Sequence, residues 1–171
     1  MKKQVFIIDT SAILSGKPIR FDNVSIVTTP AVSDELSPGG RDFRTFELLK
    51  ETGLAIHAPS KEAINRVKKT AQETGDDRRL SFADIEVVAL AIDINKEPDQ
   101  EATIFTDDYS IQNVASTLQI KFQGFSQKGI TKKFKWVSRC PGCKKQFNEI
   151  TKICPICGTI TKSSLLHKKN L

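Results

Sequence analysis

Residues 1–122 alternate between short apolar runs and stretches with helical periodicity, and this alternation limits the possible folds more than any other feature. Five runs rich in Val, Ile and Phe have the length and polar ends of β-strands: residues 4–9, 24–27, 54–58, 102–106 and 120–122. Helices are predicted between and after them, over residues 30–36, 41–51, 60–73, 81–95 and 109–118. Strands that alternate with helices form a mainly parallel sheet covered on both faces. The sequence therefore predicts an α/β domain.

The helix predicted over residues 81–95 has the clearest pattern. Apolar side chains recur at the spacing i, i+3, i+4 and i+7, which gives one apolar face: Ile85, Val88, Ala89 and Ile92. Ser81 and Asp84, three residues apart, have the pattern of a capping box at the start of this helix. We therefore expect the helix to start at this pair.

Charge is divided unevenly along the chain. Residues 1–122 carry 15 basic and 19 acidic side chains, whereas residues 123–171 carry 11 basic side chains and one acidic side chain, Glu149. So basic a segment is typical of a module that binds a polyanion, although lysines can also serve only to keep a small domain in solution. We predict four segments: an α/β domain over residues 1–122, a basic linker over residues 123–136, a cysteine module over residues 137–160 and a basic tail over residues 161–171.

All four cysteines lie in the cysteine module, as two Cys-x₂-Cys pairs separated by ten residues: Cys140, Cys143, Cys154 and Cys157. Each pair can present two thiolates from a tight turn, so two pairs complete a tetrahedral metal site. We predict one structural Zn²⁺, on which so small a module depends in order to fold. Two disulfides are one alternative, which a cytoplasmic location disfavours, and a rubredoxin-like iron site is the other.

Five basic residues lie in or next to the cysteine module: Lys132, Lys133, Lys135, Lys144 and Lys145. We expect these side chains to bind RNA phosphates, with Phe134, Trp136 and Phe147 as candidates for stacking on unpaired bases. The alternative is that Trp136 and Phe147 form the core of the module, an interpretation that we favour for Phe147.

Acidic side chains stand at the ends of two predicted strands. Asp9 ends the first strand, and Asp107 and Asp108 follow the fourth. In open parallel sheets, ligands bind beyond the carboxyl ends of the strands. Asp84, in the first turn of its helix, and Glu35, near the end of the helix after the second strand, could join them if the first and fourth strands are neighbours.

Carboxylates that converge repel one another, and a divalent cation removes this penalty. Oxygen ligands without a histidine suit Mg²⁺ or Mn²⁺, and such ions can orient a phosphodiester and activate a water. This chemistry is that of a nuclease. Ordinary alternatives exist for single acids: Asp84 and Asp107 as helix caps, and Glu35 as an exposed surface acid.

Four acidic segments follow one another along the chain, FIIDTSAIL, AVSDEL, LSFAD and FTDDYSIQN. On an α/β pattern they resemble the four acidic motifs of PIN-domain ribonucleases. With a basic linker and a four-cysteine zinc ribbon behind them, nearly the whole chain resembles, more narrowly, the Nin-one-binding family of ribosome-maturation endonucleases of archaea and eukaryotes.

The resemblance implies a PIN-like fold, with a central parallel sheet flanked by helices, and a small zinc ribbon. It implies a metal-dependent endoribonuclease that cleaves precursor small-subunit ribosomal RNA at its mature 3′ end, with the pre-small ribosomal subunit as partner. The motifs assign the Mn²⁺ or Mg²⁺ ligands to five acids: Asp9, Glu35, Asp84, Asp107 and Asp108. In the last pair, the family pattern of a threonine, any residue and an aspartate points to Asp108, but Asp107 stands equally close and both are kept.

Two other functions are compatible with the sequence. A non-catalytic assembly factor could bind ribosomal RNA and use its acids only structurally, and a toxin-type PIN ribonuclease fits residues 1–122, although such toxins usually lack a zinc ribbon. No run approaches the roughly 18 apolar residues of a membrane span, and the first residues are too short and too charged for a secretory signal. We therefore expect a cytoplasmic protein without a membrane partner.

Overall fold

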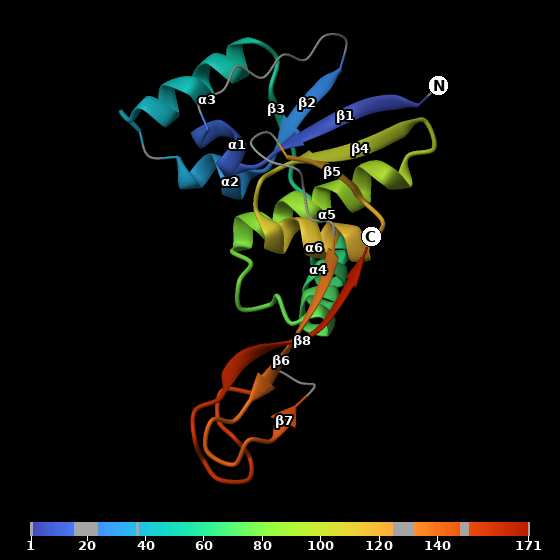
Figure 1. Cartoon of the computed structure of the whole chain (residues 1–171). Coiled ribbons are helices and arrows are strands. Elements are labelled where there is room, and N and C mark those ends of the chain that lie inside the picture. The colour runs from blue at the N-terminus through green and yellow to red at the C-terminus, as the bar shows by residue number, and fades with distance from the viewer. Residues whose placement is uncertain (1, 16–23, 37, 125–131, 148–150, 171) are drawn as a thin grey trace.

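A computed structural model describes residues 2–15, 24–36, 38–124, 132–147 and 151–170 (Figure 1). The side chains of residue 41 and of residues 132–136 and 165–170 lie outside this description. Within the described ranges, every helix is too short or too polar to cross a membrane.

Five parallel strands form the central sheet, in the order β3-β2-β1-β4-β5 (Figure 1). Their bounds are β1 (Lys3–Ile8), β2 (Ser25–Thr28), β3 (Ala55–Ile56), β4 (Gln100–Phe105) and β5 (Lys121–Gln123). All neighbouring strands pair in parallel, which confirms the predicted α/β class. The carboxyl ends of the strands therefore face the same edge of the sheet.

The third strand is shorter than predicted. β3 covers two exposed residues instead of residues 54–58, and it pairs with Val27 and Thr28 of β2. It lies at the edge of the sheet, where a short strand offers little backbone to an outside chain. The local apolar run therefore overstated the length of pairing that the fold allows.

In the ranges that the structure describes, six helices surround the sheet: α1 (Thr10–Leu14), α2 (Pro30–Glu35), α3 (Arg41–Glu51), α4 (Lys61–Thr74), α5 (Phe82–Lys96) and α6 (Tyr109–Thr117). Figure 1 shows α4, α5 and α6 together on one side of the sheet and α1 and α3 on the other, while α2 contacts α5. Five of them match the predicted helices to within about two residues. The remaining one, α1, has five residues, too few to produce a periodic pattern.

α5 is buried on nearly all sides rather than on one face. From Glu86 to Ile92 every residue is buried, because α5 packs on β1 and β4 and is covered by α2, α4 and α6. The residues of the predicted apolar face, Ile85, Val88, Ala89 and Ile92, do pack in the core. Residues such as Glu86 and Ala91 lie outside that face and are buried by helices whose positions depend on the fold.

The C-terminal part forms a separate antiparallel sheet in the order β7-β6-β8, with β6 (Lys132–Arg139), β7 (Gln146–Phe147) and β8 (Lys162–Asn170). β6 pairs with β8 from Lys132–Asn170 to Arg139–Lys162, and β6 also contacts α4 and α6. In Figure 1 this ribbon extends from those helices to the loops that carry the cysteines.

Two sequence predictions for this part were wrong about local structure. Residues 132–136, predicted within a linker, belong to β6, and residues 162–170, predicted within a loose tail, form β8. Each strand is stabilised by pairing with the other, about 30 residues away in the chain, and local composition carries no sign of such a partner. The segment boundaries at residues 122, 136 and 160 stay a prediction.

Candidate active site and cysteine centre

The carboxyl ends of β1 and β4 are adjacent. The strands pair with Ile8 opposite Phe105, and the backbone N–H of Asp9 donates a hydrogen bond to the carbonyl oxygen of Phe105 at 3.3 Å. Asp9 and Thr106, the next residue of each strand, therefore lie side by side. The predicted convergence of the acids depends on this neighbourhood of the two strands.

Asp9 is a buried carboxylate, 3% exposed, that caps α1. Its Oδ1 accepts the backbone N–H of Thr10 at 2.7 Å, and its Oδ2 accepts the hydroxyls of Ser11 at 2.6 Å and Thr106 at 2.8 Å. Burial raises the pKa of Asp9; these hydrogen bonds lower it only in part, and the charge of Asp108 raises it further. The side chain is thus fixed in orientation, while burial disfavours its ionised form.

Thr106 connects Asp9 to Asp108. Its hydroxyl donates to Asp9 and accepts the backbone N–H of Asp108 at 3.0 Å. Asp108 in turn caps α6, since its Oδ1 accepts the backbone N–H of Ser110 at 2.6 Å and of Ile111 at 3.4 Å. One threonine therefore fixes the geometry between the acids at the ends of two strands.

Asp107 and Asp108 differ in their surroundings. Both are half-buried, but it is the charge of Asp108 that raises the pKa of Asp9 and contributes to raising that of Asp84. The helix cap that the sequence allowed for Asp107 is formed by Asp108 instead. Asp108 therefore interacts electrostatically with Asp9 and Asp84, and which member of the pair is the fourth acid stays a prediction.

Asp84 takes part in the capping box of α5. Its Oδ2 accepts the backbone N–H of Ser81 at 2.6 Å, and the Ser81 hydroxyl accepts the backbone N–H of Asp84 at 3.1 Å. Burial raises the pKa of Asp84, the hydrogen bonds with Ser81 lower it, and the charges of Asp9 and Asp108 raise it. Asp84 is therefore both a cap and an electrostatic neighbour of the other acids.

Glu35, the last residue of α2, is exposed and lies next to α1. Its Oε2 accepts the hydroxyl of Thr10 at 2.6 Å. Thr10 and Ser11 have different partners: the hydroxyl of Ser11 donates to Asp9, whereas the hydroxyl of Thr10 connects α1 to Glu35. We call Asp9, Glu35, Asp84 and Asp108 the acid cluster, and Asp107, next to Asp108 in the chain, stays a candidate ligand beside it.

Three helices begin at the acid cluster. Asp9 precedes α1, Asp84 stands in the first turn of α5, and Asp108 precedes α6. A helix N-terminus carries about half a positive elementary charge, and its free N–H groups bind anions. The backbone therefore offsets part of the repulsion among these carboxylates and offers a setting that also suits a phosphate group.

The acid cluster fits a hard divalent cation. Among the described residues, the four cysteines are the group whose ligand atoms all lie within 4.8 Å of one another, so the acids are more widely spaced than that. A cation here would be held by a few carboxylates together with water, which is the usual way in which proteins bind Mg²⁺. Carboxylate oxygens suit Mg²⁺ or Mn²⁺ better than a soft metal.

Asp76 is a buried carboxylate, 1% exposed, to which no sequence motif pointed. Its Oδ2 accepts the hydroxyl of Thr74 at 2.8 Å and the Nδ2 of Asn113 at 2.6 Å. Burial raises its pKa, and the charge of Asp108 contributes. Asp76 thus joins the loop before α5 to α6, and the many charged residues around it, in the segment ETGDDRRL, give no local sign that this carboxylate is buried.

Two further buried groups hold the site in place and were not predicted. The Nε2 of Gln112 donates to the carbonyl oxygen of Thr106 at 2.9 Å, which fastens α6 to the end of β4. The Oε2 of Glu86 accepts the backbone N–H of Ala31 at 3.0 Å, which fastens α2 to α5. Gln112 and Glu86 lie inside helical patterns, where the sequence gives no sign of a specific partner.

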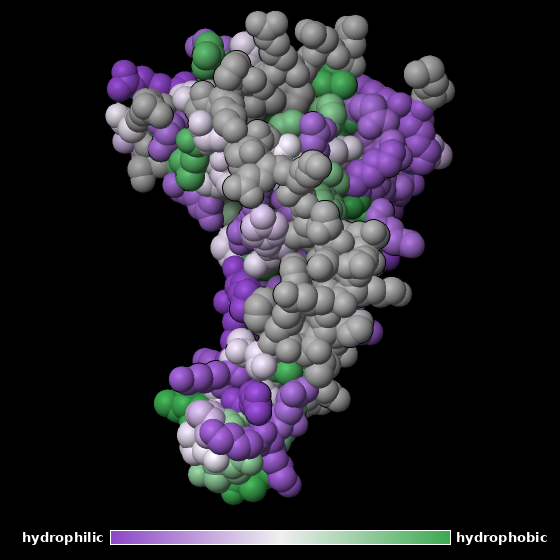
Figure 2. All heavy atoms as spheres, in the orientation of Figure 1, coloured by the Kyte–Doolittle hydropathy of each residue, from purple (hydrophilic) through white to green (hydrophobic). Residues whose placement is uncertain are grey.

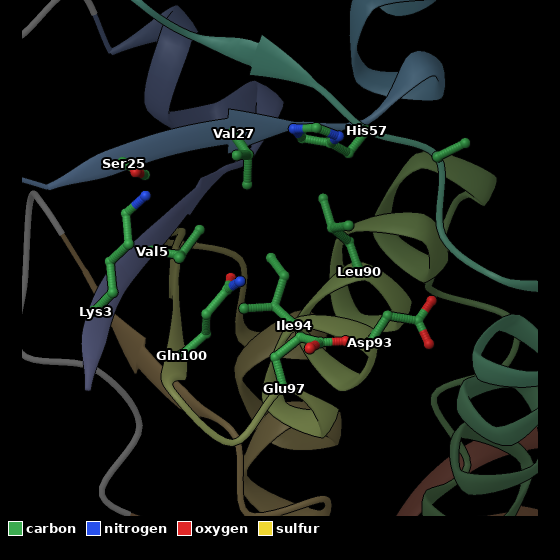
Figure 3. A pocket seen from close by; sticks show the side chains of 11 residues that line it. Lys3, Val5, Ser25, Val27, His57, Leu90, Asp93, Ile94, Glu97 and Gln100 are labelled. Atoms are coloured by element: carbon green, nitrogen blue, oxygen red, sulfur yellow. The ribbon is translucent and has the colours of Figure 1, made fainter.

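A separate hollow of about 440 Å³ lies on the α5 side of the sheet (Figure 3). Val5, Val27 and Leu90 line it, and Figure 3 shows His57 and Asp93 at its border. The carboxylate of Asp93 accepts the hydroxyl and the backbone N–H of Ser60. Since its described lining contains none of the predicted acids, this hollow is distinct from the acid cluster.

The four cysteines form a compact site. Their ligand atoms lie within 4.8 Å of one another, and the Sγ atoms are 3.3 Å apart for Cys140 and Cys157 and 3.6 Å apart for Cys143 and Cys154. All four are free thiols, so the two-disulfide alternative is not realised. Tetrahedral Zn–S bonds of about 2.3 Å would separate the sulfurs by roughly 3.8 Å, close to the observed spacing.

The two cysteine turns repeat the same backbone path. The N–H of Lys144 donates to the carbonyl oxygen of Cys140 at 3.1 Å, and that of Gly158 donates to the carbonyl oxygen of Cys154 at 3.0 Å. Lys144 and Gly158 occupy equivalent positions and both have positive φ, 64° and 71°. Gly142 is required for another reason: a Cβ there would lie 2.9 Å from the Oγ1 of Thr159 in the other turn.

Lys144 and Lys145 are exposed on this module, and Figure 2 shows hydrophilic residues over much of its surface. The other three predicted RNA-binding lysines lie in β6, where their side chains are outside the described part of the structure: Lys132, Lys133 and Lys135. The side chains of Phe134 and Trp136 also lie outside the described part of the structure. Phe147 is half-buried.

The chain is similar to known ribonucleases over most of its length. A family profile described as the PIN domain of ribonuclease matches residues 6–94. Endoribonuclease Nob1 of Archaeoglobus fulgidus is 37% identical over 157 residues, which are 91% of this chain and 88% of the relative. Endoribonuclease Nob1 of Pyrococcus abyssi is 36% identical over 94% of this chain and 93% of its own length.

Ribonuclease VapC1 of Thermoplasma acidophilum is also 37% identical, over 98% of this chain and 81% of its own length. The profile match covers α2, most of α5 and the end of β1, which carry or border three members of the acid cluster, Asp9, Glu35 and Asp84, and the match to the Pyrococcus abyssi relative extends over the cysteine segment. From this similarity and the parallel sheet that carries the acids, it follows that the chain belongs to the Nob1 family of PIN-domain endoribonucleases.

Proposed function

We propose that this endoribonuclease cuts precursor small-subunit ribosomal RNA at its mature 3′ end, with Mn²⁺ or Mg²⁺ bound at the acid cluster. The observation that carries the catalytic part is the gathering of Asp9, Asp84 and Asp108 at three helix N-termini on one edge of the sheet. The choice of RNA is supported by the resemblance to ribosome-maturation endonucleases and by the basic C-terminal part.

A divalent cation at this edge would supply orientation of the scissile phosphate, activation of a water and neutralisation of the leaving oxygen. Asp9 would be its central ligand, because three donors fix this carboxylate and burial disfavours its ionised form unless a cation binds. The described caps use one oxygen of each of the other aspartates, Oδ2 of Asp84 and Oδ1 of Asp108, and leave the second oxygen for the cation. Glu35 would be the outer, exposed member.

The test is incubation of the full chain with a small-subunit RNA fragment that spans the mature 3′ end, with Mn²⁺, with Mg²⁺ or with EDTA, followed by mapping of the 5′ and 3′ products. We expect one metal-dependent cut that leaves a 3′-hydroxyl and a 5′-phosphate. Asp9→Asn should abolish the cut but keep RNA binding, while Asp34→Asn, which changes an exposed acid next to Glu35, should cut normally. Cleavage at random positions contradicts the proposed substrate.

A non-catalytic assembly factor is the second candidate, and the capping roles of Asp9, Asp84 and Asp108 favour it, since each acid already has a structural partner. The same experiment separates the two. Binding of the fragment without any cut, with either metal, identifies the assembly factor. A toxin-type ribonuclease would cut RNAs unrelated to the ribosome. The cysteine module disfavours this function, because such toxins usually lack a zinc ribbon.

We further propose that the four cysteines hold one structural Zn²⁺, and that residues 1–122 form the nuclease domain. The free thiols and their spacing support a tetrahedral thiolate site. Elemental analysis of the purified chain should find one zinc per molecule. A visible absorption band with one equivalent of iron would identify the rubredoxin-like alternative.

A further inference from the structure

Two aromatic side chains beside the acid cluster are largely exposed. Phe82 is 55% exposed and Tyr109 is 54% exposed. Each is the first residue of a helix that begins at the acid cluster, Phe82 in α5 and Tyr109 in α6. Their exposure therefore occurs at the edge of the sheet where the acids gather.

Core packing does not account for either ring. In α5, Phe82 is the one exposed residue between positions 82 and 94, all of which the structure describes, while the helix behind it is buried. Other phenylalanines of the described part are used in the core: Phe46 is 1% exposed, and Phe6 and Phe105 pack edge to face with ring centroids 5.6 Å apart. Phe82 and Tyr109 thus expose apolar surface that the fold itself does not use.

The backbone holds both aromatic residues at fixed positions relative to the acids. Phe82 lies inside the capping box formed by Ser81 and Asp84. Tyr109 directly follows Asp108, whose carboxylate caps the next two residues of α6. Phe82 stands two residues before Asp84 and Tyr109 one residue after Asp108, so each aromatic residue adjoins one of two acids that interact electrostatically.

An RNA strand whose phosphate lies at this site would bring its bases close to these rings. Unpaired bases stack on aromatic faces without sequence preference, and such stacking is a main source of affinity for single strands. Uncharged rings also suit this place for an electrostatic reason. Lysine or arginine side chains there would form ion pairs with the acids and compete with a cation, whereas phenylalanine and tyrosine would not.

We propose that Phe82 and Tyr109 form a base-stacking site for the nucleotides that flank the scissile phosphate, and that this site selects single-stranded RNA. The inference rests on the proposed function, since it takes the acid cluster as the place of the phosphate. Bases within a duplex already stack on their neighbours and cannot reach the rings, so a duplex would bind without this contribution.

The test measures binding rather than cutting. Asp9→Asn protein, which should not cut, is titrated with a fluorescent single-stranded RNA that spans the cut, and with the same RNA carrying abasic nucleotides on both sides of it. We expect Phe82→Ala and Tyr109→Ala each to weaken binding of the intact strand by roughly 5- to 100-fold. Tyr109→Phe should restore the affinity, and Leu48→Ala, which changes an exposed side chain of α3, should not affect it.

The abasic strand decides between stacking and a general structural effect. If the rings bind bases, the abasic strand should bind the parent protein and both alanine variants equally. An equal loss with intact and abasic strands, or no loss with the intact strand, overturns the stacking site. A wild-type chain that cuts no RNA overturns the proposed nuclease function, while a loss confined to the intact strand would still support the stacking site.

Discussion

The carboxyl group of Asp9 accepts three hydrogen bonds and is nevertheless disfavoured as an anion, because burial raises its pKa more than the donors lower it. The nearby charge of Asp108 adds to this effect. A group in such surroundings gains more from a bound cation than an exposed carboxylate does. Asp9 is therefore the residue through which binding of a divalent metal should affect stability.

We expect Mn²⁺ to raise the thermal unfolding midpoint of the zinc-loaded wild-type chain, since a ligand that binds the native state stabilises it by mass action. At 100 times the dissociation constant the gain is about 2.7 kcal/mol. Asp9→Asn should show little or no rise, and Asp34→Asn should behave as the wild type. Differential scanning calorimetry with and without Mn²⁺ measures this, and an equal rise in Asp9→Asn would remove Asp9 from the metal site.

Asp76 gives a prediction about pH. Burial raises the folded-state pKa of Asp76 above the ordinary value of an aspartate, so the folded protein binds its proton more tightly than the unfolded chain does. This group therefore destabilises the fold above its folded pKa, and the effect disappears as the pH falls to the unfolded value. The Asp76→Asn variant has no ionisable group at this position, so this contribution to the pH dependence of its stability is absent.

The free energy of unfolding of Asp76→Asn, relative to wild type, should therefore increase between about pH 4 and pH 7. Urea unfolding of both proteins at several pH values measures this difference, with Asp77→Asn as an exposed control. A difference that decreases with pH would mean that the hydrogen bonds from Thr74 and Asn113 outweigh burial.

Single residues were predictable where they stand in a motif. Asp9, Asp84 and Asp108 follow from strand ends and helix starts, and all three lie at one edge. Asp76 and Gln112 could not be found, because each has its partner on another element: Asn113 for Asp76 and the carbonyl oxygen of Thr106 for Gln112. A buried polar side chain is recognised by what surrounds it, which no local pattern records.

At the scale of elements, the two cysteine turns have the same path but different residues at one position. Gly158 adopts positive φ without strain, whereas Lys144 has a Cβ and adopts it at a cost of about 1–2 kcal/mol. We expect Lys144→Gly to stabilise the cysteine module and to slow metal loss to a chelator, although it removes one cation.

Lys145→Gly is the matched control, since it removes the same charge at a position without positive φ. It should weaken RNA binding about as much as Lys144→Gly but should not slow metal loss. Metal release to a coloured chelator and RNA titrations measure the two effects. Faster metal loss in Lys144→Gly would mean that the lysine side chain stabilises the turn.

Elements were predictable when their own residues determine them. The parallel strands and most helices follow from periodicity and caps, as in the Ser81–Asp84 capping box. β8 could not be predicted in this way, because its residues form a strand through pairing with β6. α1 was missed because five residues are too few for a period, and β3 was overestimated because an edge position limits its pairing.

At the scale of the whole molecule, the chain divides into an acidic α/β part and a basic part held by β6 and β8. The buried apolar cluster of the α/β part runs from Val5 to Ile120. Deletion of residues 162–171 removes β8, and we expect it to lower the metal affinity of the cysteine module while the α/β part keeps its unfolding transition. Zinc content and thermal unfolding of the shortened chain measure this.

The fold class and the two-part organisation were predictable because they depend on properties summed over many residues. The arrangement of the parts was not, since the contact of β6 with α4 and α6 joins segments far apart in the sequence. A marked loss of thermal stability of the α/β part in the shortened chain would mean that this contact contributes to its stability.

The length of the paired strands β6 and β8 has a consequence for where RNA would be cut. Eight residues of β6 at about 3.3 Å each give a strand roughly 26 Å long, which contacts α4 and α6 and leads to the turn that carries Lys144 and Lys145. Under the proposed function, the length of this strand helps to set the distance between the lysines that would bind RNA and the acids that would cut it. The number of residues in β6 would then help to determine how many nucleotides separate the bound segment of the RNA from the cut.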